Sequence, residues 1–152
     1  MTAAPRIGDL ANWLLLLVLS AAGLGTSGYL TYSHYADQAT VCAGIGSCEF
    51  VQTSEYSEIL GVPVALMGLL FFVGLGALSL LRVVLWQRNV EWAHPLAFSL
   101  TLGGTAFVSY LTYVELFVID AICVWCVVTA CITAASLLAV LWGIASAVRP
   151  AR

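Results

Sequence analysis

The chain has very few charged side chains. Asp, Glu, Lys and Arg make up 9% of its 152 residues, and lysine is absent. Soluble domains carry about 25% charged and about 45–50% apolar residues, whereas this chain is 62% hydrophobic with a mean hydropathy of +1.02. A soluble globular domain is therefore excluded, and the sequence predicts an integral membrane protein. With no basic patch, there is also no reason to expect nucleic-acid binding.

The sequence also lacks an internal repeat, a low-complexity tract and any polar stretch long enough for a second domain. Instead it contains four apolar segments of the length needed to cross a bilayer as a helix, which is roughly 20 residues. These segments predict a single domain over residues 1–152, folded as an all-α bundle of four transmembrane helices. They run over residues 13–32, 62–86, 95–118 and 122–142.

The first apolar segment has an alternative interpretation as a cleaved signal peptide, because Ala21, Ala22 and Gly23 resemble a cleavage site. However, only Arg6 precedes the segment, and the apolar run continues to Tyr32. A retained helix is therefore favoured, and its small residues are expected to allow close packing between helices.

The few basic residues are distributed asymmetrically. In a four-helix topology they all fall at the two chain ends or at the connection between helices two and three. The positive-inside rule then places both termini in the cytoplasm and the long loop of residues 36–61 outside. Arg82 is expected to extend toward the headgroups, and His94 to belong to an interfacial belt. The basic residues are Arg6, Arg82, Arg88, Arg149 and Arg152.

Two cysteines, Cys123 and Cys126, open the last apolar segment. In a helix they lie one turn apart on the same face, and Asp120 is a candidate N-cap that would place Cys123 at position N3. Helix N-termini lower thiol pKa values, so this pair predicts a redox centre at a membrane edge. Cys131, on another face of the same helix, is interpreted as a buried small apolar residue.

The outer loop contains a second pair, Cys42 and Cys48, separated by Ala-Gly-Ile-Gly-Ser. The two glycines supply flexibility that lets these thiols meet each other or a partner. The following residues 49–60 predict a short amphipathic segment on the membrane surface, which includes Ser54.

Three roles are open for the four outer thiols: a redox relay, two structural disulfides or a metal site of four thiolates. A Cys-X-X-Cys bridge encloses almost no chain and stabilises little. The five-residue spacing of the loop pair also differs from the two to four residues usual in zinc sites. The relay is therefore favoured, while the four thiols allow three complete pairings.

Taken together, the ordered motifs resemble the vitamin K epoxide reductase family, specifically bacterial homologues that oxidise thiols and reduce quinone without a fused thioredoxin-like domain. The matching motifs are Cys42-X5-Cys48, Ser54, Gly-Val-Pro at 61–63 and Cys123-Val-Trp-Cys126.

The resemblance implies a four-helix bundle around a quinone, menaquinone or ubiquinone, capped by the outer loop with its half-helix. It implies that Cys126 lies beside the quinone ring and Cys123 is its disulfide partner. Cys48 then exchanges with Cys123, and Cys42 meets a separate thioredoxin-like (DsbA-like) protein outside the cytoplasm. Ser54 matches a serine near the active site. Animal epoxide reductases carry a tyrosine where this chain has Ala130, which favours plain quinone reduction.

Two other classes compete with this interpretation. DsbB-type oxidases perform similar chemistry in four helices, but their membrane Cys-X-X-Cys lies in the first outer loop, whereas here it opens the last helix. A non-enzymatic membrane protein with structural disulfides or a thiolate metal site is the second alternative.

Overall fold

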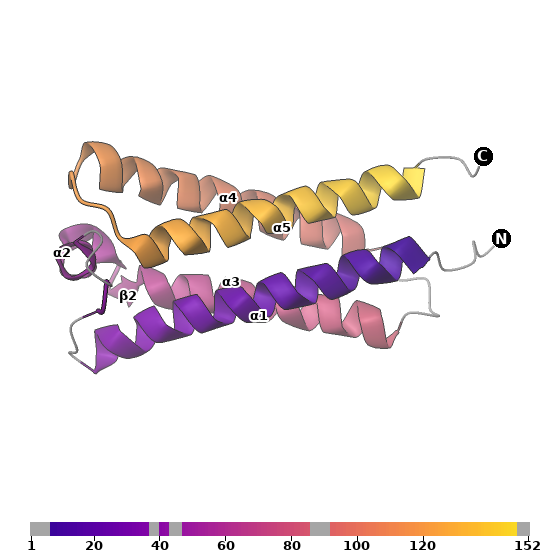
Figure 1. The fold of residues 1–152 in the computed structure, drawn as a ribbon, viewed down its shortest axis with the longest axis horizontal. Helices are drawn as coiled ribbons and strands as arrows, with labels where there is room; N and C mark the ends of the chain where they lie inside the picture. The colour runs from indigo at the N-terminus through magenta and orange to yellow at the C-terminus, as the bar shows by residue number, and fades with distance from the viewer. Residues whose placement is uncertain (1–6, 37–39, 43–46, 86–91, 149–152) are drawn as a thin grey trace.

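Four long helices lie side by side along the length of the molecule (Figure 1). The computed structural model describes residues 7–36, 40–42, 47–85 and 92–148. All four helices are long and apolar enough to cross a membrane, which confirms the predicted bundle and makes the chain a multi-pass membrane protein. They are α1 (Ile7–Tyr35), α3 (Val64–Val84), α4 (Ala93–Phe117) and α5 (Val124–Val148).

The start of α1, the end of α5, the end of α3 and the start of α4 lie at one end of the bundle, and the short elements cover the other end (Figure 1). Of the five arginines, only Arg82 lies within the described residues. Which end faces the cytoplasm therefore remains a prediction from the sequence. Trp86, the expected end of the second span, also lies outside the described residues, and α3 ends at Val84.

Residues 47–63 form a cap over one end of the bundle. They fold as α2 (Cys48–Gln52), a 3-10 turn η1 (Glu55–Ser57) and a small hairpin of β1 (Glu58–Ile59) and β2 (Val62–Pro63). The hairpin turns at Leu60 and Gly61, whose φ angles of 54° and 77° are both positive, as a two-residue type I′ turn requires. The expected single amphipathic segment is thus broken into several pieces.

Small residues set the spacing of the helices. α1 packs against α3 and α5, and α4 packs mainly against α5. Gly23 in α1 lies directly against the ring of Phe72 in α3, so that even a Cβ there would overlap the ring. Gly68 in α3 likewise faces Ser27 in α1. In lipid, where apolar burial drives little helix association, such close approach is a main source of packing energy.

An ion-pair network joins three helices at the end opposite the cap. Asp9 in α1 accepts a 2.8 Å hydrogen bond from Arg82 in α3 and a 3.1 Å bond from the indole of Trp13, and His94 in α4 lies 3.3 Å away. Arg82 is buried. The expected headgroup contact of Arg82 is therefore wrong, and His94 belongs to this network rather than to an interfacial belt. The Asp9 carboxylate, one helix turn before Trp13, thus holds the Arg82 and His94 side chains inside the bundle.

Candidate active site

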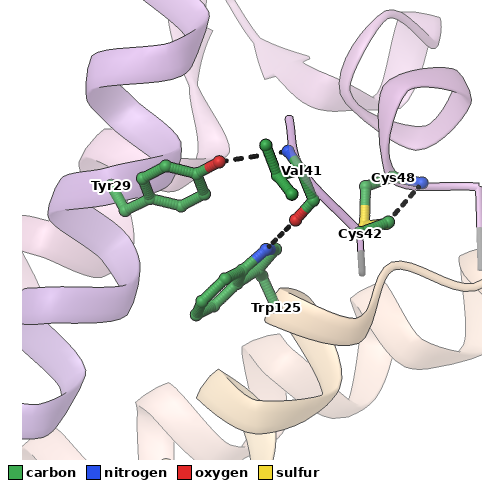
Figure 2. The surroundings of a disulfide bond; sticks show 5 residues. All are labelled: Tyr29, Val41, Cys42, Cys48 and Trp125. Atoms are coloured by element: carbon green, nitrogen blue, oxygen red, sulfur yellow. Dashed lines mark hydrogen bonds between the residues drawn. A yellow bond between two sulfur atoms is a disulfide. The ribbon is translucent and has the colours of Figure 1, made fainter. Parts of the chain in front are cut away.

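The four predicted site cysteines come together beneath the cap. Cys42 and Cys48 form a disulfide, with their Cα atoms 5.9 Å apart (Figure 2). Cys48 and Cys123, with exposed fractions of 1% and 0%, share one buried cluster with Val51. Cys126 packs against this cluster, and both Cys123 and Cys126 are free thiols. The fold therefore places a bonded pair beside a reduced pair that lies more than 70 residues away in the sequence.

Backbone hydrogen bonds hold the cap against the start of α5. The Ser47 N–H donates to the Ile122 carbonyl at 3.0 Å, immediately before Cys123. The next N–H, that of Cys48, points at the Cys42 sulfur at 3.1 Å. The first residues of α2 are thus fixed both to the loop disulfide and to the segment that carries the second pair.

Two aromatic side chains hold the backbone of Val41, the residue before Cys42. The Val41 N–H donates to the Tyr29 hydroxyl at 3.0 Å, and its carbonyl accepts a 2.8 Å bond from the indole of Trp125 (Figure 2). The two rings contact each other with centroids 5.0 Å apart. Trp125 lies between the two cysteines of the last motif, so it connects the loop pair physically to the membrane pair. This role of Trp125 is not predictable from the sequence, because no local pattern links residues 84 apart.

The turn between α4 and α5 differs from the prediction. Asp120 is not the N-cap of the last helix: it adopts a left-handed conformation with φ of 52°, and α5 begins only at Val124. Asp tolerates this region better than most residues, and the reversal after α4 uses the positions that were expected to form the first turn. Cys123 therefore occupies the position just before the helix, where its carbonyl accepts the Val127 N–H at 3.1 Å.

The neighbouring Cys126 thiol and the start of α5 both favour a thiolate at Cys123. A hydrogen bond from the Cys126 thiol is the largest influence, and it lowers the pKa of Cys123 to about 7 against the opposing effect of burial. The backbone N–H groups of Cys126 and Trp125, at the open end of α5, lower this pKa further. The two thiols share a proton and titrate as a pair, so the reduced pair is poised for oxidation near neutral pH.

An apolar cavity of about 100 Å³ lies between the cap and the inner faces of the four long helices. Cys126 lines it from α5 and Ser54 from the cap, and apolar side chains such as Leu30, Val64 and Leu111 make up most of the wall. The Ser54 hydroxyl donates to the Val51 carbonyl at 2.7 Å. Apolar walls with a few polar groups are typical of small-molecule sites, so the chemistry of the lining suits the ring of the predicted quinone.

The cavity also contains a residue that the sequence analysis did not select. Glu115 in α4 is only 5% exposed, and its carboxyl lies within hydrogen-bonding reach of the Cys126 thiol and the backbone N–H of Cys123. The single thiol proton of Cys126 can therefore be donated either to Cys123 or to Glu115. An acidic residue inside an apolar membrane-spanning segment is by itself a signal of function, and that signal was available.

Two further observations concern the alternative roles of the thiols. Within the described parts of the chain, no group of three or more His, Cys, Asp or Glu side chains is placed to hold a metal ion. Cys131 is exposed on the outside of α5, not buried as expected. The reason is geometric: the face of α5 at position 131 points away from the neighbouring helices, toward the surface that lipid would cover.

The family assignment agrees with this geometry. The sequence model of the vitamin K epoxide reductase family matches residues 14–141, a range that includes the cap, both cysteine pairs and most of the four long helices. The chain therefore belongs to the vitamin K epoxide reductase family, which implies that it is a membrane thiol–disulfide oxidoreductase.

Proposed function

We propose that this protein is a thiol–quinone oxidoreductase that supports disulfide formation outside the cytoplasm. It takes two electrons from a separate thioredoxin-like protein and passes them through its two cysteine pairs to menaquinone or ubiquinone. One observation carries the proposal: Cys48 and Cys123 are buried in one cluster, and Cys126 lines an apolar cavity beside them.

The relay begins at the loop pair. A thiolate of the reduced partner attacks Cys42, which is more exposed than Cys48, and the partner's second thiol resolves the mixed disulfide. The partner leaves oxidised, and Cys42 and Cys48 are left as thiols. An open groove of about 490 Å³, lined by Thr40, Cys42, Ser47, Cys48 and Phe50 among others, lies beside this disulfide and offers space for a segment of the partner.

The second exchange passes the electrons inward. The Cys48 thiolate attacks Cys123 in a Cys123–Cys126 disulfide and releases Cys126, and Cys42 then displaces Cys123 to restore the loop disulfide. The structure has the loop pair bonded and the inner pair as free thiols. This is the state expected after inward transfer and before oxidation by quinone, when Cys123 and Cys126 reform their disulfide.

Orientation follows from the arginines. Because all five fall at the chain ends or the connection between the second and third spans, the positive-inside rule supports cytoplasmic termini. The cap and the cysteines then face the oxidising compartment, where disulfides persist and where a thioredoxin-like partner would reach Cys42.

The test is anaerobic quinone reduction by purified protein in detergent, driven by a reduced thioredoxin-like donor. Alanine variants of Cys42, Cys48, Cys123 and Cys126 should each lose turnover, and a small dithiol that bypasses the loop should restore Cys42→Ala. Cys131→Ala, which removes a thiol outside the site, is the matched control and should keep the wild-type rate.

A trapping experiment tests the order of transfer. Cys42→Ala keeps the Cys123–Cys126 disulfide but lacks the thiol that resolves the next intermediate, so without added dithiol it should accumulate a Cys48–Cys123 disulfide, detected by mass spectrometry of peptides after thiol blocking. If wild-type protein reduces neither quinone, or if Cys126→Ala turns over at the wild-type rate, the proposal fails.

A further inference from the structure

The buried carboxyl of Glu115 lies where the proposed reaction must move protons. Two donors converge on it, the Cys126 thiol and the Cys123 backbone N–H, one from each cysteine of the inner pair. The same side chain lines the apolar cavity together with Cys126. Both donors fit an ionised carboxylate, which only accepts hydrogen bonds. Burying an ionised acid in an apolar site is costly unless the acid is paired, so the position of Glu115 in this cavity indicates a role in the chemistry of the site.

The proposed reaction transfers protons as well as electrons. Two thiols that become a disulfide lose two electrons and two protons, and a quinone that becomes a quinol gains the same. The electrons pass directly from sulfur to the ring, but the protons need a group that first accepts and then donates. Because the walls of the cavity are buried and mostly apolar, the proton transfer must be carried out by a side chain of the protein.

Other polar groups around the cavity are less suited to this task. The hydroxyls of Ser54, Thr112 and Thr129 each donate to a backbone carbonyl. Apart from Glu115, the titratable groups in the lining are Cys126, which is the thiol that the reaction oxidises, and Tyr56, which is exposed. Glu115 is therefore the lining residue that is buried, titratable and in contact with a reacting thiol.

We propose that Glu115 is a catalytic residue that carries protons from the inner thiol pair to the quinone. As the Cys123–Cys126 bond forms, the carboxylate takes the Cys126 proton and gives it to a quinone oxygen. The proton of the Cys123 thiol follows the same route to the second quinone oxygen, and Glu115 ends as it began. This inference rests on the proposed quinone reduction and names the residue that completes its proton balance.

The test replaces Glu115 with glutamine, which keeps the shape but cannot carry a proton. Loss of a general acid–base group costs about 10²–10⁴-fold in rate, so Glu115→Gln should slow quinone reduction by at least about 100-fold. Thiol–disulfide exchange with the donor, measured without quinone, should change by less than about 3-fold, because it does not use this route. Asp120→Asn, an exposed acid five residues further on, is the matched control and should leave both rates unchanged.

A second readout does not depend on quinone turnover. The charge of Glu115 is one of the influences that raise the pKa of the Cys123 thiol. In a Cys131→Ser background, the ultraviolet thiolate absorbance of Glu115→Gln should therefore appear at lower pH than in the parent. Glu115→Gln should therefore form the thiolate more easily and yet reduce quinone more slowly. A merely structural role for Glu115 does not predict this combination.

Glu115→Ala with added formate keeps the test decisive if the glutamine variant folds poorly. Formate can occupy the vacated space and carry protons, so it should restore part of the lost rate in proportion to its concentration. If the wild type turns over and Glu115→Gln reduces quinone at a rate within about 3-fold of it, the loss of about 100-fold expected for a general acid–base group is absent. That result would overturn this inference and leave the proposed function intact. Absence of turnover in the wild type would instead remove the proposed function itself.

Discussion

The network around Asp9 should contribute strongly to the stability of the bundle. Asp9→Asn removes the charge that receives hydrogen bonds from Arg82 and Trp13 and that faces His94. The change keeps the size of the side chain, so the effect reports the charge. It also leaves the Arg82 guanidinium buried opposite a neutral amide.

The magnitude follows from burial. Breaking a fully buried ion pair costs about 3–5 kcal/mol, and exposed pairs contribute about 0–1 kcal/mol. The Arg82 and Asp9 side chains are 10% and 20% exposed, so we expect Asp9→Asn to cost about 2–4 kcal/mol, nearer the buried limit. For a protein of this size, about 2–4 °C per kcal/mol translates this into a fall in Tm of about 4–16 °C.

The assay is a double-mutant cycle of Asp9→Asn, Arg82→Met and both together, followed by thermal unfolding in one detergent. Each single variant leaves one buried charge without its main partner, whereas the double variant leaves none. The loss in the double variant should therefore be no larger than in either single one, which gives a coupling energy of at least about 2 kcal/mol. Glu58→Gln breaks the more exposed His34–Glu58 pair, at 3.2 Å, and should shift stability by less than about 0.5 kcal/mol. Strictly additive losses in the cycle would show that the two charges do not stabilise each other.

Three further perturbations test the packing and the site. Trp125→Phe keeps an aromatic ring but loses the hydrogen bond to the Val41 carbonyl. The cost of about 1 kcal/mol should raise hydrogen exchange at the Val41 amide about 5-fold. Unchanged exchange would show that this bond does not hold the Val41 backbone. Gly23→Ala places a methyl group against a buried ring and should cost about 1–3 kcal/mol, while Gly25→Ala, with open space around it, should not lower Tm. The Cys123 thiolate should form with a midpoint near pH 7, so thiolate is lost as pH falls below it, and replacing the second cysteine of the motif by alanine should move that midpoint upward; a midpoint that stays in place would refute the shared proton.

The fold was largely predictable because membrane insertion leaves a strong one-dimensional signal. A stretch such as residues 64–84 has almost no alternative to a spanning helix, since backbone groups in lipid must be satisfied within the segment. The cap was less predictable. Its break at Ser54 and its hairpin at Leu60 and Gly61 depend on contacts with the bundle below, whereas the sequence of residues 49–60 shows only mixed polarity.

At the site, the cysteines were predictable because their spacing carries the chemistry, but the residues around them were not. The prediction of Asp120 as N-cap failed since capping rules consider one helix at a time, and here the reversal from α4 required a left-handed residue at that position. No functional role was predicted for Trp125 or Tyr29, because aromatic residues are common near membrane interfaces whatever their contacts. Their contacts with Val41 depend on the three-dimensional fold alone.

The loop disulfide must open and close in every cycle of the proposed relay, so the cap should not depend on it for its position. A bridge between residues six apart stabilises a chain by about 2–3 kcal/mol through loop closure. That is comparable with the combined net contribution of the bonds from Val41 to Tyr29 and Trp125 and from Ser47 to Ile122, at about 1 kcal/mol each. These contacts involve no sulfur and are unaffected by the redox state. They are therefore sufficient to keep Cys48 beside Cys123 while the disulfide is broken, when a cap held by the disulfide alone would be released.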